Sequence, residues 1–224
     1  MVLVLLLPPL RVRLLFVRDE RDAYQLVRRC ARRVVMLSGI QVRVSHAERM
    51  PDAGASMLVS NHVSVADAAL LVAMLPFDVR FVANHIYARY PILGPIIRGA
   101  SANVVNRSSW RSRADSGQAM QDALASGRSL LVFPEGTTSE SGEMLPFRSG
   151  AFRAAARTGR PIVPIALTGT RALMPANSWL LAPASIAIEV LPPIAARDAT
   201  RDGISALSEQ AATAIRTALA SRNG

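Results

Sequence analysis

Short apolar runs rich in β-branched residues alternate with stretches of helical periodicity from about residue 40 onward. The predicted strands are Gln41–Val44, Met57–Ser60, Arg80–Ala83, Ala102–Val105, Ser129–Phe133, Ile162–Leu167 and Ser185–Val190. The predicted helices are Val65–Leu75, Trp110–Ser126, Gly150–Thr158 and Ile204–Ser221. Strands that alternate with helices predict an α/β fold with a mostly parallel central sheet flanked by helices. We therefore expect one α/β domain over residues 40–224.

Residues 1–39 have a different pattern and are predicted to form an N-terminal amphipathic helical extension that interacts with a membrane. Between Arg21 and Ser38, apolar residues recur at helical spacing, arginines fall between them, and Gly39 is a suitable end signal. In one interpretation the apolar face lies in the acyl boundary and the arginines contact lipid phosphates. In the other, the helix packs on the domain core with its cationic side in solvent. The apolar segment Met1–Val17 directly upstream favours the membrane.

The longest uncharged apolar stretch, Met1–Leu10, contains two prolines. Crossing a bilayer takes about 20 apolar residues, so this stretch is too short. Arg11 and Arg13 follow the apolar run and no positive charge precedes it, which is not the pattern of a signal peptide. We expect the protein to lie on a bilayer, as a peripheral or monotopic protein.

All 26 cationic residues of this 224-residue chain are arginines, and the formal net charge is +10. The absence of lysine excludes Schiff-base chemistry and the phosphate-binding P-loop. The single cysteine, Cys30, excludes an internal disulfide and a cysteine-cluster zinc site. The basic charge favours anionic partners, and an aromatic content of 5% offers few stacking surfaces to nucleic-acid bases. We expect an anionic membrane surface rather than nucleic acid as the partner. Arginine-only usage suggests a GC-rich bacterial genome. We expect the protein on the cytoplasmic face of the bacterial inner membrane.

His62 lies between a predicted strand and a predicted helix, five residues before Asp67. On one continuous helix the two side chains would face about 140° apart and could not meet. However, Ser64 to Asp67 fits a capping box, with Ser64 as N-cap and Asp67 at the third helical position. His62 then precedes the helix, and the carboxylate can turn back toward the imidazole. Such a carboxylate fixes the tautomer and leaves the other ring nitrogen as a base. The alternative is a helix cap beside an unrelated loop histidine.

A second candidate site follows the predicted strand Ser129–Phe133, in the run Pro134-Glu-Gly-Thr-Thr-Ser139. The carboxyl end of a strand is where α/β sheets place ligand sites. There Glu135 could hydrogen-bond a polyol, and Gly136 would let the backbone approach a ligand closely. An ordinary turn of small polar residues is the alternative.

Taken together, these segments resemble the glycerolipid acyltransferase family, represented by 1-acylglycerol-3-phosphate acyltransferases. The resemblance covers roughly residues 57–167 and rests on the order and spacing of short blocks. The blocks are Asn61-His-Val-Ser-Val-Ala-Asp67, Val105-Asn-Arg107, Phe133-Pro-Glu-Gly-Thr137 and Pro161-Ile-Val-Pro-Ile165, with Leu145 to Phe152 similar to a further family stretch.

The resemblance implies a role for each block. His62 would be the general base and Asp67 its orienting partner, and Pro161 to Ile165 would help to line the acyl or acceptor pocket. Arg107 would bind an anionic headgroup. The remaining residues implied in binding the acceptor are Glu135, Gly136 and Thr137. The reaction needs neither metal nor redox cofactor. The oxyanion donors are not evident, and backbone amides near the His62 loop are one candidate.

Two positions depart from the pattern of family members that act on a phosphate acceptor. Thr138 stands where an arginine is usual, and Asn84 stands where a lysine is common. Two cations are therefore missing near the expected headgroup site, which weakens the Coulomb attraction for a phosphate dianion. Arg148 could supply part of the missing charge.

The implied reaction is transfer of a fatty acyl group from acyl-CoA or acyl carrier protein to the free hydroxyl of a lysolipid. The expected acceptor is 1-acylglycerol-3-phosphate, in phospholipid biosynthesis. The departures at positions 84 and 138 motivate an alternative acceptor, such as lyso-ornithine lipid or a lysophospholipid with a larger headgroup. A non-catalytic basic protein that binds membrane or nucleic acid is the alternative from another class, and it leaves the ordered blocks unexplained.

Overall fold

The computed structural model describes residues 2–51, 54–64, 66–84, 97, 101–105, 110–139, 143–173 and 182–223. Its centre is a seven-stranded sheet with strand order β1-β7-β6-β2-β5-β3-β4. The strands are β1 Gln41–Ser45, β2 Met57–Ser60, β3 Arg80–Asn84, β4 Ser101–Val105, β5 Leu130–Val132, β6 Ile162–Thr168 and β7 Ser185–Val190. Neighbouring strands run parallel except β6 and β7, which are antiparallel. The predicted α/β fold with a mostly parallel sheet is confirmed.

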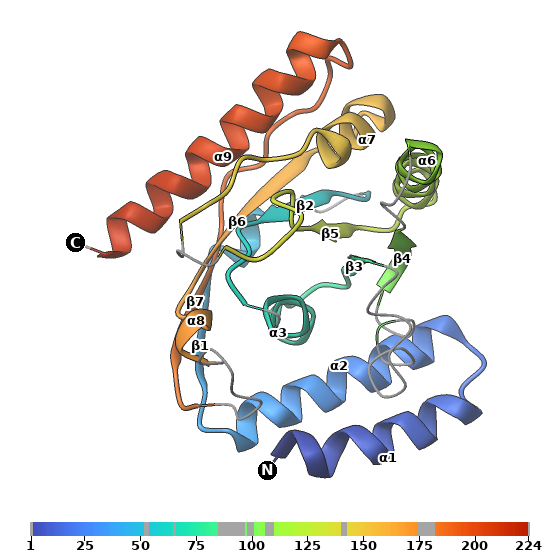
Figure 1. Cartoon of the computed structure of the whole chain (residues 1–224), viewed down its shortest axis with the longest axis vertical. Coiled ribbons are helices and arrows are strands. Elements are labelled where there is room, and N and C mark those ends of the chain that lie inside the picture. The colour runs from blue at the N-terminus through green and yellow to red at the C-terminus, as the bar shows by residue number, and fades with distance from the viewer. Residues whose placement is uncertain are drawn as a thin grey trace.

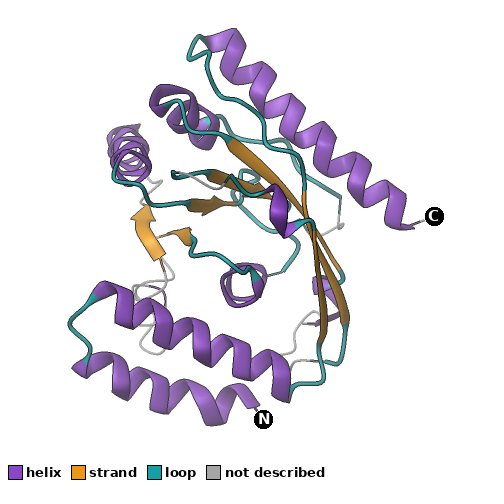
Figure 2. Cartoon of the chain, turned by 180° about the vertical axis from the view of Figure 1, so that it is seen from behind, coloured by secondary structure: helices purple, strands orange, loops and turns teal. Residues whose placement is uncertain are grey.

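Helices cover both faces of the sheet (Figures 1 and 2). They are α1 Val2–Phe16, α2 Glu20–Leu37, the short 3-10 helix η1 Ala47–Arg49, α3 Asp67–Met74, α6 Trp110–Ala125, α7 Gly150–Thr158, α8 Thr170–Leu173 and α9 Arg201–Asn223. Helices α6, α7 and α9 lie on one face, and α3 lies on the other, where α2 covers α3 and α1 packs outside α2. This second side of the molecule therefore carries successive helical layers.

The central strands are buried on both faces, which explains their continuous apolar sequences. In β2, Met57 and Val59 pack into the core beneath α6, α7 and α9, whereas Leu58 packs into the core beneath α3. The strand β5 alternates in the same way, with Leu131 on the α3 side. Each strand thus binds the two helical layers into one domain.

The structure corrects the membrane interpretation of α2. Its apolar stripe packs on the protein, with Val27, Val34 and Val35 buried, and Val35 belongs to the core beneath α3. Two of its arginines also face the protein: Arg28 donates to the Leu75 carbonyl and pairs with Asp78, and Arg32 donates to the Ala73 carbonyl. The apolar stripe is buried because α2 packs against α3, where Val35 joins Leu70 and Leu71 in one core cluster.

The ends of helix α1 were not predicted from the sequence. Pro8 and Pro9 interrupt the helical pattern there, yet both lie inside the helix. It packs on α2, with Leu10 buried and Leu15 and Phe16 exposed. None of the helices, as far as the chain is described, is both long and apolar enough to cross a membrane.

Candidate active site

The two candidate segments meet at one edge of the sheet. Strands β2 and β5 pair in parallel, with Val59 opposite Val132, so the residues that follow them leave the sheet side by side. His62 follows β2, and Glu135 follows β5. This edge holds the carboxyl ends of the parallel strands, where α/β sheets place ligand sites.

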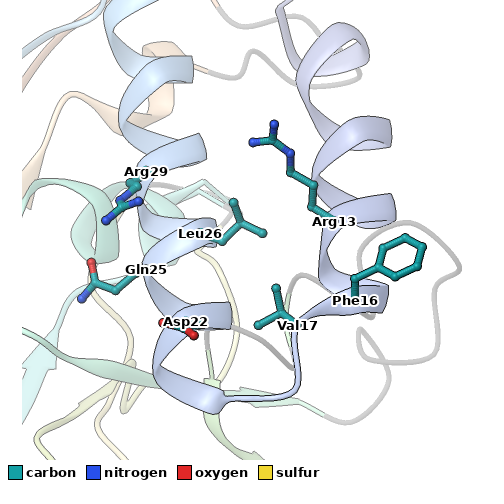
Figure 3. Close-up of a pocket in the computed structure, with 7 residues that line it drawn as sticks. All are labelled: Arg13, Phe16, Val17, Asp22, Gln25, Leu26 and Arg29. Atoms are coloured by element: carbon teal, nitrogen blue, oxygen red, sulfur yellow. The ribbon is translucent and has the colours of Figure 1, made fainter.

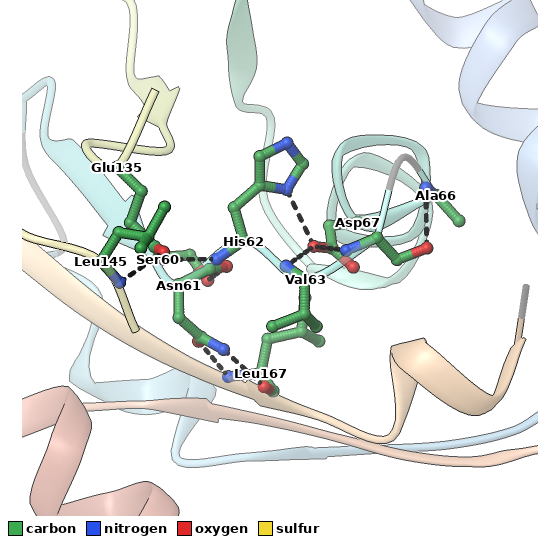
Figure 4. Close-up of polar contacts among 10 residues, drawn as sticks. Ser60, Asn61, His62, Val63, Ala66, Asp67, Glu135, Leu145 and Leu167 are labelled. Atoms are coloured by element: carbon green, nitrogen blue, oxygen red, sulfur yellow. Dashed lines mark hydrogen bonds and ion pairs between the residues drawn. The ribbon is translucent and has the colours of Figure 1, made fainter. Parts of the chain in front are cut away.

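His62 and Asp67 are joined by a hydrogen bond of 2.9 Å between Nδ1 of the imidazole and Oδ2 of the carboxylate (Figure 4). The same oxygen accepts the backbone amides of Val63 and Ser64, each at 2.9 Å. A carboxylate oxygen that takes these donors can only accept, so Nδ1 carries the proton and Nε2 has the free electron pair. Among the described residues, Nε2 has no hydrogen-bond partner, and the His62 side chain is 18% exposed.

Asp67 is fully buried at the first residue of α3. The predicted capping box is half present: the carboxylate accepts the Ser64 amide, but the Ser64 hydroxyl accepts from Ala66 rather than from Asp67. The helix begins at Asp67, two residues later than the predicted start at Val65. Its second oxygen, Oδ1, is buried without a partner in the described part of the chain.

Glu135 is also buried, and its carboxylate joins two loops. Oε1 accepts the backbone amide of His62 at 2.7 Å, and Oε2 accepts that of Leu145 at 2.8 Å (Figure 4). Burial raises the pKa of this carboxyl above its usual value, and the two amides and the nearby imidazole offset part of that rise. Its observed partners are thus backbone groups of the protein.

Further contacts fix the His62 loop. The imidazole stacks on the Phe133 ring, with centroids 4.1 Å apart and planes 17° from parallel. The Ser139 amide donates to the His62 carbonyl at 3.2 Å. The Asn61 side chain exchanges two hydrogen bonds of 2.9 Å with the backbone of Leu167 in β6. The sequence analysis placed Asn61, Phe133 and Leu145 in the resembling blocks but gave them no role, because their roles depend on partners distant in sequence.

The structure describes some of the remaining predicted site residues and not others. Gly136 has a positive φ of 80° and closes a turn by donating to the Phe133 carbonyl, a conformation that favours glycine. The side chains of Thr137 and Arg148 are exposed, and the Arg148 amide donates to the Pro134 carbonyl. Arg107 lies outside the described residues, and so does the side chain of Asn84.

The candidate oxyanion donors near His62 are already engaged. The amides of His62, Val63, Ser64 and Ala66 donate to Glu135, Asp67 and the Ser64 hydroxyl. These four amides are engaged within the protein, and the Val65 amide of the same loop lies outside the described residues, so oxyanion donation by backbone amides near the His62 loop stays a prediction.

The segment Pro161 to Ile165, which the resemblance implies in lining the acyl or acceptor pocket, runs along β6 toward this edge and reaches it with Ile165 opposite Ser60. Ile162 begins β6 beside Met57, at the end of the sheet away from His62. Ile162, Val163 and Ile165 are fully buried, because both faces of β6 are covered by helices. The part of β6 near His62 is its end, at Leu167.

A hollow of about 390 Å³ lies elsewhere, between α1 and α2 (Figure 3). It is lined by Arg13, Phe16, Val17, Asp22, Gln25, Leu26 and Arg29. None of these residues takes part in the hydrogen bonds described above for the His62 loop, so those groups, and not this hollow, locate the candidate site.

Known proteins share both the sequence pattern and the fold. The 1-acyl-sn-glycerol-3-phosphate acyltransferase of Limnanthes douglasii is 32% identical over 175 residues, which cover 76% of this chain and 60% of the relative. The enzyme of that name from Borreliella burgdorferi is 27% identical over 172 residues, covering 77% and 69%. The chain thus spans about three fifths of the plant relative.

Among solved structures, the crystal structure of the 1-acyl-sn-glycerophosphate (LPA) acyltransferase PlsC from Thermotoga maritima has the same fold. Its TM-score is 0.73 at 22% identity, over 94% of this chain and 87% of that chain. A family model described as Acyltransferase matches residues 41–168, which include His62, Asp67 and Glu135. Because that match spans more than half of the chain, this protein belongs to the Acyltransferase family.

Proposed function

We propose that this protein transfers a fatty acyl group from acyl-CoA or acyl carrier protein to the free hydroxyl of a lysolipid. The acceptor we propose is 1-acylglycerol-3-phosphate, which would place the reaction in phospholipid biosynthesis. The observation that carries the proposal is the hydrogen bond of 2.9 Å between His62 and Asp67, which leaves Nε2 as a base. Membership of the Acyltransferase family supports the reaction type.

In the proposed mechanism, Nε2 of His62 takes the proton of the acceptor hydroxyl while its oxygen attacks the thioester carbonyl carbon. The tetrahedral intermediate then collapses, the carbon–sulfur bond breaks, and the imidazolium returns the proton to the leaving thiolate. Asp67 stabilises the imidazolium through Nδ1. General base catalysis accounts for roughly 10²–10⁴ in rate, so positioning and oxyanion stabilisation contribute the rest. This chemistry requires no metal ion or redox cofactor.

The test is mass spectrometry of the lipids formed when purified protein receives a mixed lysolipid pool and one acyl thioester. We expect a new diacyl lipid and release of one thiol per ester formed. His62→Ala should abolish both, while His46→Ala is the matched control, because His46 follows β1 and its imidazole pairs with the exposed side chain of Glu48. Wild-type turnover in His62→Ala would exclude the proposed base.

A second acceptor class follows from Thr138, which is half-buried in the turn after β5 where an arginine would favour a phosphate. A lysophospholipid with a larger headgroup or lyso-ornithine lipid is the alternative product of the same assay. If the lysolipid pool yields only that product, the acyl-transfer chemistry stands and the proposed acceptor falls.

We also propose that the protein reaches its acceptor from an anionic membrane surface, on the cytoplasmic face of a bacterial inner membrane. Support comes from large apolar side chains that α1 and the end of α2 expose, although the stripe of α2 itself is buried. These side chains are Val12, Leu15, Phe16, Met36 and Leu37. Exposed Arg13, Arg29 and Arg33 lie on the same two helices and could contact lipid phosphates.

A further inference from the structure

Glu135 is a buried carboxylate whose two oxygens both hold backbone amides. It is 3% exposed, and its partners come from the loop after β2 and from the segment before α7. The amide of His62 is 2.7 Å from Oε1, and the amide of Leu145 is 2.8 Å from Oε2 (Figure 4). Distances this short are typical of charge-assisted hydrogen bonds. The carboxylate therefore bridges two loops that are not neighbours in sequence.

The burial of the Glu135 carboxylate is not explained by a gain in folding stability. Burying an ionised carboxylate is costly unless a cation or several donors compensate it. No arginine of the described chain forms an ion pair with Glu135. The charge of Glu135 is therefore compensated by two backbone amide donors and not by a cation. One of these amides is that of His62 itself.

His62 is held from several sides, by the turn after β5 and by Asp67 of α3. Glu135 takes its backbone N–H, and Ser139 donates to its backbone carbonyl. Phe133 stacks on the imidazole, and Asp67 holds Nδ1. With the backbone and the ring both held, Nε2 has little freedom to move relative to Asp67.

We propose that Glu135 is a positioning residue that holds the His62 loop in its reactive geometry, and that it does not bind the acceptor. The proposal rests on the proposed function only in taking His62 as the general base. A displacement of about 1 Å at a reacting group costs on the order of 10²-fold in rate, so a backbone brace on the base affects turnover directly.

The experiment compares Glu135→Gln and Glu135→Asp with Glu209→Gln. Glutamine keeps the shape, but its NH₂ group faces an amide N–H that needs an acceptor. Aspartate keeps the charge and is one methylene shorter, so it cannot reach both amides. Glu209 is an exposed carboxylate on α9, ion-paired with Arg216, and serves as the matched control.

We expect kcat to fall about 10- to 100-fold in Glu135→Gln with the KM for the lysolipid unchanged, the loss typical when a group that orients a metal ligand is changed. Glu209→Gln should keep both constants. A second readout needs no turnover: in ¹H–¹⁵N spectra of the imidazoles, of which the chain has three, wild-type His62 should be protonated at Nδ1. Glu135→Gln should shift it toward a tautomer mixture.

A raised KM with unchanged kcat and unchanged His62 signals would overturn the proposal, because an acceptor-binding residue behaves in that way. If Glu135→Gln does not fold, the kinetics of Glu135→Asp and hydrogen exchange of the wild-type amides test the proposal instead. Fast exchange of both the His62 and the Leu145 amides would overturn the proposal. If the wild type transfers no acyl group, the proposed function fails, and the imidazole spectra still test the brace.

Discussion

At the scale of single residues, the candidate site depends on how many donors Asp67 satisfies. One carboxylate oxygen accepts from His62, Val63 and Ser64, so it fixes the imidazole and the loop backbone together. Removing its charge would affect both functions. The site is therefore sensitive to changes that keep side-chain shape and alter only the donor and acceptor pattern.

Asp67→Asn tests this dependence. The asparagine NH₂ group cannot accept the donors that Oδ2 accepts, and its neutral amide stabilises an imidazolium poorly. We expect kcat to fall by on the order of 10²-fold or more. Buried donors left without an acceptor should lower the free energy of unfolding by about 1–3 kcal/mol. Thioester turnover and urea denaturation measure the two effects, and full activity would contradict the assigned role.

Because the pKa of Glu135 is raised, we also predict how its contribution to the stability of the fold changes with pH. Because burial raises its pKa in the folded state, the folded protein holds this proton at pH values where the unfolded chain has lost it. The contribution of Glu135 to the free energy of unfolding should therefore decrease as pH rises from the unfolded pKa through the folded one. Urea denaturation of wild type and Glu135→Gln across this pH range measures it. An increase with pH would have the wrong sign.

At the scale of elements, α2 is part of the domain and not a separable anchor. Arg28 and Arg32 donate to carbonyls at the carboxyl end of α3, where a cation also opposes the negative end of the helix dipole. The Tyr24 hydroxyl accepts the Val79 amide, and the Tyr24 ring lies beneath the Arg80 guanidinium. Since α3 carries Asp67 at its first turn, α2 supports the element that orients His62.

Arg28→Ala measures how strongly α2 is docked. The substitution leaves a buried Leu75 carbonyl without its donor, so we expect a loss of about 1–3 kcal/mol in the free energy of unfolding. Arg29→Ala changes the next, exposed arginine of the same helix and should cost within about 0.5 kcal/mol. Chemical denaturation compares them. Equal effects would show that the Arg28 contact does not hold α2.

At the scale of the whole molecule, the net charge of +10 and the apolar side chains on α1 predict how the protein meets a membrane. Long-range attraction brings a cationic protein to anionic lipid, and salt screens that attraction with a Debye length of about 10 Å at 0.1 M. Burial of apolar side chains then adds a contribution that depends little on salt. The two contributions are separable by experiment.

Leu15→Ser with Phe16→Ser tests the apolar contribution, measured by flotation with anionic and with neutral vesicles. Both side chains are exposed, so the double variant should fold, and we expect weaker binding to anionic vesicles that high salt weakens further. Deleting residues 1–38 is not an equivalent test, because it would uncover core residues packed against Val35. Unchanged flotation of the double variant would exclude α1 as the contact.

The sequence alone determined the strands, most of the longer helices and the central pair of chemical groups in the site. Each of the seven predicted strands is present, because a buried strand is recognised from its own apolar run and flanking turns. The pairing of His62 with Asp67 was also predictable, since the two lie five residues apart and a local turn joins them. Helix ends were less well predicted, as at α3, which was predicted to begin at Val65 and begins at Asp67.

Only the tertiary structure decided which residues, distant in sequence, contact one another across the sheet. The bond between Glu135 and the His62 amide joins residues 73 positions apart, and it depends on β5 pairing beside β2. The same holds for the buried stripe of α2 and for the position of Ile162 at the far end of β6. Periodicity records which side chains are apolar, but the strand order, set by contacts distant in sequence, determines which surfaces they cover.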